Sequence, residues 1–225
     1  MLRVTWIGQA GLLFKSHDRT ILIDPYLSDS VAGLDPAKTR KIPPDPALWQ
    51  VKPDVIIFTH DHLDHFDPET AGHWLGEKGS IRVLAPSSVW QKVRKYGWDH
   101  NYILFDPGTQ WTDGGLRFTA VPAAHSDPHA IGVLLQEGGK QHYVTGDTLY
   151  STRVLSALPD DIDTVFLPIN GVGNNMNIVD AARFAADCGA RTAVPLHYGL
   201  FDNLNGEDFP FENKRILQVY REEIL

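Results

Sequence analysis

Residues 59–67 read T-H-D-H-L-D-H-F-D and directly follow the apolar run V-I-I-F of residues 55–58. The apolar run predicts a buried strand. The next nine residues hold three histidines and three aspartates, where an ordinary turn carries Gly, Asn, Ser or Pro. Neutral imidazoles and carboxylates are ligands of zinc and of its first-row neighbours. The stretch therefore predicts a metal site at the end of a strand.

Length, charge and cysteine content narrow the class of protein. A chain of 225 residues commonly forms one unit, so we expect a single domain over residues 1–225. The net charge of -8 and the lack of a Lys/Arg cluster argue against nucleic acid as a partner. No signal-peptide pattern and no apolar stretch of membrane-spanning length occur, which predicts a cytoplasmic protein without a membrane partner. The one cysteine, Cys188, is expected to be a small core residue.

Apolar runs bounded by Gly, Pro and polar residues predict short strands along the whole chain. The expected strands are residues 3–7, 11–15, 20–23, 55–58, 81–84, 102–105, 116–121, 130–136, 141–145, 163–167 and 191–196. The first three should form an antiparallel meander, and those between 102 and 145 a second β group.

Helix start and stop signals occur at four places. Asp67-Pro68-Glu69 reads as an N-cap, an N1 proline and an acidic first turn of a helix that runs to about Leu75. Pro86-Ser87-Ser88 opens a second helix that Gly97 closes, and Asn177 with Asp180 resembles a capping box before residues 178–188. A last helix is expected over residues 211–223.

Each of the two β-rich blocks is followed by alternating strands and helices. This order fits an α/β fold, a four-layer αβ/βα sandwich in which two sheets pack face to face and helices cover the outer faces. The irregular loop at residues 26–52 offers Arg40 and Lys41 for an anion. The loop at residues 170–177 offers the amides of Asn170, Asn174 and Asn175 for hydrogen bonds.

The turn after residue 58 can feed two neighbouring metal sites. His60 and His62 are two residues apart and project to the same side if the chain is still extended. Asp64 and His65 follow the bend and can face a second ion. A catalytic site keeps a position for water and draws its other ligands from elsewhere in the chain. Three residues that each follow an expected strand qualify as these ligands: His125, Asp147 and His197.

These residues together resemble the motifs of the metallo-β-lactamase superfamily, and the resemblance spans nearly the whole chain. It rests on Asp24, on the run His60-x-His62-x-Asp64-His65, and on His125, Asp147 and His197. Residues 5–11 (TWIGQAG), 59–65 (THDHLDH) and 145–148 (TGDT) are most similar to the ascorbate-6-phosphate lactonase-like hydrolases.

The resemblance implies a dinuclear metal-dependent hydrolase and a role for each residue. The first metal would be bound by His60, His62 and His125, the second by Asp64, His65 and His197, and both by Asp147, while Asp24 would orient the site from outside. Two divalent ions about 3.5 to 4 Å apart would provide a bridging hydroxide as nucleophile against an ester, lactone or related bond. Zinc and manganese are the expected ions. Asp64 or His129 would carry the proton to the leaving group.

Other acidic residues and histidines are expected outside this site. Asp61 and Asp67 should have structural roles, and the four histidines without a partner pattern should lie at the surface: His17, His73, His100 and His142.

Three other functions remain open from the sequence. The same two metals could cleave phosphodiesters, although the acidic balance argues against a nuclease. A redox role as in flavo-diiron proteins is weaker, because by resemblance those carry a carboxylate where this chain has His62. A non-catalytic, metal-bound sensor is the alternative from a different class. For a hydrolase, the partner is a small-molecule substrate, and Arg40 and Lys41 favour an anionic one; a homo-oligomer is left open.

Overall fold

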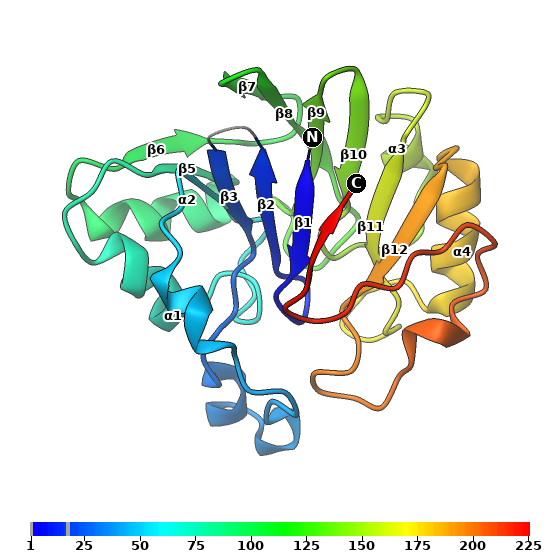
Figure 1. Ribbon diagram of the computed structural model, residues 1–225, viewed down its shortest axis with the longest axis horizontal. Helices are drawn as coiled ribbons and strands as arrows, with labels where there is room; N and C mark the ends of the chain where they lie inside the picture. The colour runs from blue at the N-terminus through cyan, green and yellow to red at the C-terminus, as the bar shows by residue number, and fades with distance from the viewer. Residues whose placement is uncertain (1, 17–18) are drawn as a thin grey trace. The chain divides into compact units, whose positions relative to one another are not determined.

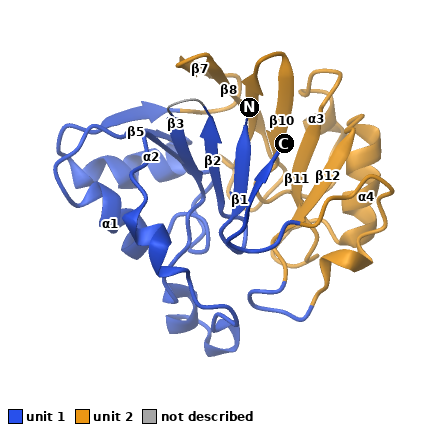
Figure 2. Ribbon diagram, viewed as in Figure 1, with its two compact units in different colours: residues 1–104, 199–203, 217–225 blue, residues 105–198, 204–216 orange. Residues whose placement is uncertain are grey.

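The computed structural model describes residues 2–16 and 19–225 (Figure 1). Contacts within the chain divide it into two compact units (Figure 2). Unit 1 comprises residues 1–104, 199–203 and 217–225, and unit 2 comprises residues 105–198 and 204–216. Each unit contains one β-sheet, and we describe the units one at a time. The single domain over residues 1–225 stays a prediction.

The sheet of unit 1 has seven strands in the order β13-β1-β2-β3-β4-β5-β6. Their bounds are β1 Arg3–Trp6, β2 Leu12–Ser16, β3 Arg19–Ile23, β4 Val55–Ile57, β5 Arg82–Ala85, β6 Asn101–Leu104 and β13 Glu222–Ile224. The predicted antiparallel meander of β1, β2 and β3 is confirmed. From β3 to β6 the strands are parallel. Since β3 and β4 are parallel neighbours, the residues that follow them leave the sheet at the same edge.

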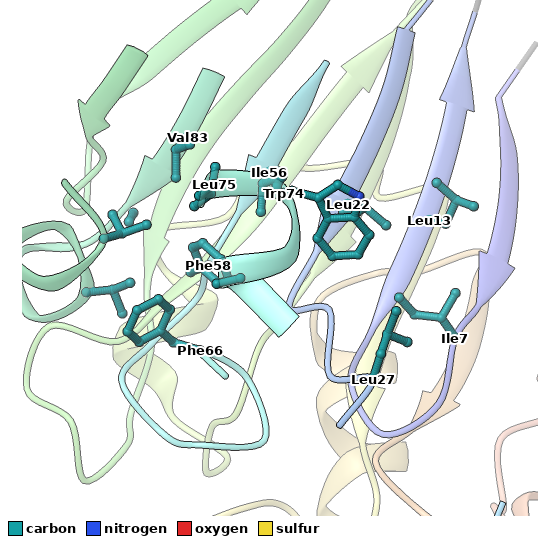
Figure 3. Close-up of a cluster of buried hydrophobic side chains, with 14 of the residues drawn as sticks. Ile7, Leu13, Leu22, Leu27, Ile56, Phe58, Phe66, Trp74, Leu75 and Val83 are labelled. Atoms are coloured by element: carbon teal, nitrogen blue, oxygen red, sulfur yellow. The ribbon is translucent and has the colours of Figure 1, made fainter. Parts of the chain in front are cut away.

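Two helices cover one face of this sheet, α1 (Pro68–Leu75) and α2 (Ser87–Val93). Figure 3 shows Trp74 and Leu75 of α1 beside Ile56 and Val83 of the strands. The Asp67 carboxylate accepts hydrogen bonds from the backbone N–H groups of residues 69 and 70, so the predicted N-cap is confirmed. A 3-10 turn (Arg94–Tyr96) extends α2 to the predicted stop at residue 97.

The sheet of unit 2 has six strands in the order β12-β11-β10-β9-β8-β7. Their bounds are β7 Gln110–Asp113, β8 Leu116–Pro122, β9 Ile131–Glu137, β10 Lys140–Val144, β11 Thr164–Pro168 and β12 Thr192–Leu196. The helices of this unit are α3 (Thr152–Leu155) and α4 (Ile178–Asp187). The Asn177 side chain accepts from the N–H groups of residues 179 and 180, which confirms the predicted start of α4.

Strand direction places four chain segments at one edge of this second sheet. β10, β11 and β12 are parallel to one another. β8 and β10 are both antiparallel to β9, so β8 runs in the same direction as β10. The carboxyl ends of β8, β10, β11 and β12 therefore share an edge. The residues that follow them include His125, Asp147, Asn170 and His197.

Two elements differ from the sequence prediction. The last helix, expected over residues 211–223, is wrong: residues 222–224 form β13, which pairs with β1. A sheet edge gave this segment backbone partners that outweigh a weak helical preference. Residues 101–104, expected in the second β group, form β6 and pair parallel with β5. The strand β7 was missed, although the two glycines at 114 and 115 before β8 are a hairpin signal.

Burial corrects the histidine predictions. His142 is 1% exposed and His100 is 7% exposed, so their prediction as surface residues is wrong. His73 is exposed as predicted, and the prediction for His17 lies outside the described residues. Cys188 is buried as expected, and burial raises the pKa of its thiol to about 11. Among the described residues, no helix is both long enough and apolar enough to cross a membrane.

Candidate metal centre

The turn after β4 gathers three of the four predicted ligands of unit 1 around one point. The backbone N–H groups of His65 and Phe66 both donate to the carbonyl of His62, at 3.0 and 2.8 Å. This tight turn folds His65 back toward the end of the strand. The ring centroid of His60 lies 4.6 Å from that of His62 and 4.0 Å from that of His65. His60 and His65 are fully buried, whereas His62 is only partly buried.

Asp24, which follows the neighbouring strand β3, stabilises this turn through hydrogen bonds. Its Oδ1 accepts from the Thr59 backbone N–H at 2.7 Å, and its Oδ2 accepts from the Thr59 hydroxyl at 2.5 Å. The same Oδ2 lies 2.7 Å from Nδ1 of His65. Both carboxylate oxygens are thus engaged with the protein. Asp24 could itself lie near an ion, since it groups with His60 and His65, but these contacts fit an orienting role better.

The partners of Asp24 also fix the tautomers of two histidines. Because Thr59 Oγ1 donates its proton to Asp24, it acts as acceptor toward Nδ1 of His60, 3.0 Å away. Nδ1 of His65 donates directly to Asp24. In both rings the proton then resides on Nδ1 and the lone pair on Nε2, as in a histidine that binds a metal through Nε2.

Asp64 has its own support. The side-chain amide of Gln9 donates to Asp64 Oδ2 at 2.8 Å. The same carboxylate oxygen lies 3.9 Å from Nε2 of His65. Two ligand atoms on one tetrahedral zinc, each about 2.0–2.1 Å from the metal, are roughly 3.3 Å apart. Asp64 and His65 are therefore spaced almost as two ligands of one ion.

In unit 2, one carboxylate oxygen lies between two histidines. Asp147 Oδ2 is 3.4 Å from Nε2 of His197 and 4.0 Å from Nε2 of His125. The amide of Asn175 donates to this oxygen at 2.8 Å and fixes its orientation. Asp147 is 4% exposed, and Asn175 is also 4% exposed. One oxygen of Asp147 is thus held near the Nε2 atoms of two of the candidate histidines.

The histidines of unit 2 repeat the Nδ1 pattern. Nδ1 of His125 lies 3.2 Å from the backbone carbonyl of Asn174, which can only accept, so the proton is on Nδ1. Nδ1 of His197 lies 3.0 Å from the side-chain nitrogen of Asn170. The Asn170 Oδ1 is buried without a hydrogen-bond partner among the described residues. The oxygen and nitrogen of an amide side chain are nearly isosteric, so the Asn170 amide can be turned to exchange them. In that orientation Oδ1 faces His197 and accepts a hydrogen bond from Nδ1–H.

Several of these residues have an unusual backbone conformation. The φ angles of Gln9, Asp24 and His197 are 51°, 45° and 60°, in the left-handed region that non-glycine residues seldom occupy. Such conformations persist where surrounding contacts determine them, and they cluster at functional sites. In this chain Gln9 and Asp24 make hydrogen bonds to the candidate ligands Asp64 and His65, and His197 is a candidate ligand itself.

Other predicted residues serve different contacts. His129 is exposed, and its backbone N–H donates to the side chain of Asp127. The Arg40 guanidinium donates to the backbone carbonyls of residues 26, 28 and 42, and Lys41 Nζ binds the carbonyl of Asp202 and the side chain of Asn203. Arg40 and Lys41 thus hold loops together, and their role in binding an anion stays a prediction.

Sequence reasoning missed the supporting roles of Gln9, Thr59 and the asparagine loop. It expected the amides of residues 170, 174 and 175 to face the pocket, whereas Asn170 and Asn175 contact His197 and Asp147. The signal that could have found them is the density of amides in a loop that follows a strand end. The donor set of imidazoles and carboxylates with Nδ1 engaged fits a divalent first-row metal.

Comparison with known families places this donor set in context. The family model described as a beta-lactamase superfamily domain matches residues 19–198, a range that includes all the candidate ligands. A UPF0173 metal-dependent hydrolase of Geobacillus is 29% identical to the chain over 219 residues, covering 89% of this chain and 87% of the relative.

Solved structures show the fold. Igni18, a metallo hydrolase from the archaeon Ignicoccus hospitalis, has a TM-score of 0.78 at 18% identity and covers 99% of this chain and 97% of its own. YhfI of Bacillus subtilis, a metallo-beta-lactamase fold protein, has a TM-score of 0.75 at 21% identity, with full coverage of both chains. The predicted α/β class and metallo-β-lactamase fold are confirmed.

Proposed function

The chain belongs to the beta-lactamase superfamily as a metal-dependent hydrolase, and we propose that it binds two divalent ions and hydrolyses an ester, lactone or related small-molecule bond. In this proposal His60, His62 and His125 hold the first ion and Asp64, His65 and His197 the second. Asp147 would contribute a ligand to both ions, for which zinc and manganese are the candidates. We also propose that the protein acts in the cytoplasm.

The observation that carries the proposal is the shared state of three of the five candidate histidines. Nδ1 of His60, His65 and His125 each faces an acceptor, so the proton of each ring is on Nδ1 and the lone pair is on Nε2, the atom through which such a histidine binds a metal. The same arrangement occurs in each unit, and this repetition supports the proposal.

The residues of the chain would divide the work as follows. When bound, the two ions supply a water of lowered pKa as nucleophile and polarise the bond to be cleaved. Asp24 orients the imidazole of His65, and Thr59 orients that of His60. Asn175 fixes the position of Asp147 Oδ2. His129, exposed in the loop after β8, is proposed to carry a proton to the leaving group.

Metal analysis coupled to a turnover screen tests the proposal. Bound metal would be removed from the purified protein with a chelator, and zinc or manganese would be added back. The reloaded protein would then be assayed against lactones, esters, thioesters and phosphodiesters. We expect two ions per chain, and we expect His60→Ala and Asp147→Ala to lose both metal and turnover while staying folded. The exposed His73→Ala is the matched control and should retain both. Full activity in a His60→Ala/Asp147→Ala double variant would contradict the assignment.

The screen also separates the alternatives. Turnover restricted to phosphodiesters would favour the nuclease-type reaction. The net charge of -8 argues against this alternative, because it disfavours binding of a polyanionic nucleic acid. Two bound ions with no turnover over the whole panel would favour a metal-bound sensor. The narrower lactonase-like resemblance predicts that lactones are among the substrates.

A further inference from the structure

A small pocket in unit 1 lies beside the metal-binding turn. It has a volume of about 270 Å³ and is lined by Phe66, Pro68, Lys92, Lys95 and Tyr96. Phe66 and Pro68 belong to the turn and the start of α1, while the other three residues come from α2 and the 3-10 turn after it. None of these residues belongs to the proposed metal ligands.

The pocket shares a wall with the segment that carries the candidate ligands. Phe66 follows His65 directly, and its backbone N–H donates to the carbonyl of His62 at 2.8 Å. The ring of Phe66 is fixed by an edge contact with Phe58, 5.1 Å between centroids, and Figure 3 shows the two rings together. A group bound in this pocket therefore rests on the metal-binding turn itself.

The walls of the pocket are apolar. Phe66 contributes a ring and Pro68 a pyrrolidine. The one hydroxyl in the lining, that of Tyr96, donates to the backbone carbonyl of Pro68 at 2.8 Å. With this hydroxyl already engaged, the floor presents carbon rather than hydrogen-bonding groups, and it suits an aliphatic or small aromatic group.

Two lysines, Lys92 and Lys95, line the pocket, although the chain as a whole has a net charge of -8. Lys92 Nζ lies 2.6 Å from Asp61 Oδ2, and Asp61 stands between His60 and His62. Lys95 is exposed and makes no ion pair with any residue that the structure describes. The charge of Asp67 also acts on Tyr96, but this buried carboxylate accepts hydrogen bonds from the backbone N–H groups of residues 69 and 70. The ammonium group of Lys95 is therefore the charge without an ion pair at the mouth of the apolar pocket, next to the turn.

We propose that this pocket binds an apolar group of the substrate, and that Lys92 and Lys95 select substrates with an anionic group beside it. The inference rests on the proposed hydrolase function and gives it a substrate class: small amphiphilic anions, such as an acid that also carries the bond to be cleaved. Lys95 contributes its unpaired charge, and Lys92 shares its ammonium group between Asp61 and the ligand.

Binding of short carboxylic acids to the metal-free protein tests this inference without turnover. Chelation removes the ions, so a carboxylate cannot bind through them. Butyrate, hexanoate and octanoate would be titrated by calorimetry, with octanamide as the neutral analogue of octanoate. Affinity should rise roughly fourfold per methylene until the pocket is filled. Octanoate should bind more tightly than octanamide.

The lysines are tested by substitution to methionine, which keeps the length of the side chain. Lys92→Met and Lys95→Met should each weaken octanoate binding by roughly two- to fivefold and leave octanamide unchanged, as expected for exposed charge pairs. Lys78→Met, an exposed lysine outside the pocket lining, is the matched control and should bind octanoate like the wild type. Equal affinity for butyrate and octanoate, or wild-type octanoate affinity in both lysine variants, would overturn the inference.

A kinetic measurement separates this inference from the hydrolase proposal. With any hydrolysed ester pair that differs only in an anionic group, Lys95→Met should raise KM for the anionic ester and leave kcat unchanged. Chain-length-dependent octanoate binding without any turnover would mean that the pocket assignment holds and the hydrolase proposal fails. Turnover with unchanged KM in Lys95→Met would mean the reverse.

Discussion

Nδ1 of His65 donates to Oδ2 of Asp24 at 2.7 Å, and the side chains of both residues are almost completely excluded from solvent. The two residues follow adjacent parallel strands, so the contact joins the ends of β3 and β4. It orients the imidazole and selects the tautomer that presents Nε2.

Replacement of Asp24 by Asn should weaken metal binding. The two carboxylate oxygens of Asp24 accept three hydrogen bonds, two from Thr59 and one from His65. An asparagine has only one oxygen, and its NH2 group would face a donor, so the three contacts can no longer all be kept. We expect a loss of about 10- to 100-fold in metal affinity, measured by competition with a chelator. Asp35→Asn, at an exposed carboxylate, is the control. An Asp24→Asn protein with wild-type affinity would show that the contact does not orient His65.

Substitutions of Asn170 should reveal which end of its amide faces His197. If Oδ1 accepts from Nδ1–H, Asn170→Asp keeps an acceptor and should retain or increase metal affinity. Asn170→Leu removes the acceptor and should lower the affinity by about tenfold or more. Calorimetric titration with zinc compares the two. If Asp and Leu reduce the affinity equally, the amide nitrogen is the group that faces the ring.

Burial of His142 should make the metal-free protein acid-sensitive. Burial lowers the pKa of His142 from 6.5 to about 4, against smaller opposing effects of Asp163 and Glu137, while Lys140 lowers it further. Below about pH 6.5 the unfolded chain binds a proton that the folded protein does not, so stability falls as the pH decreases toward about 4.

The unfolding free energy should therefore be about 2 kcal/mol lower at pH 5 than at pH 7 because of His142 alone. His142→Leu should therefore lose less stability between pH 7 and pH 5 than the wild type, measured by urea unfolding in the presence of a chelator. His73→Leu, at an exposed histidine, should keep the wild-type pH dependence. An identical pH dependence in His142→Leu would mean that the ring is protonated in the folded state.

Loss of the Asp67 cap should destabilise the start of α1 next to the metal-binding turn. Asp67 accepts from two backbone N–H groups and from the Ser30 hydroxyl, and it is fully buried. Asp67→Ala should lower the unfolding free energy by about 1–2 kcal/mol, and Asp67→Ser, which keeps a capping oxygen, by less. Thermal unfolding at fixed metal content compares them. Equal losses in both variants would assign the effect to something other than the cap.

Local sequence signals predicted much of the fold. The meander, the positions of most other strands and the starts of α1 and α4 follow from apolar runs and from capping residues that act over a few positions. The C-terminal segment was mispredicted because its partner, β1, lies at the other end of the sequence. His142 was mispredicted because its burial depends on neighbours that the sequence around it does not reveal.

The candidate site divides in the same way. The sequence by itself determined which residues can bind a metal, since ligand chemistry and position after a strand are local properties of His60, Asp64 and Asp147. Only the tertiary structure decided how those ligands are held. Parallel pairing of β3 and β4 brings Asp24 to Thr59 and His65. The carboxyl ends of β10, β11 and β12 lie at the same edge of their sheet, which brings Asn170 to His197 and Asn175 to Asp147. Hydrogen bonds between residues distant in sequence depend on strand order and direction, which no single segment encodes.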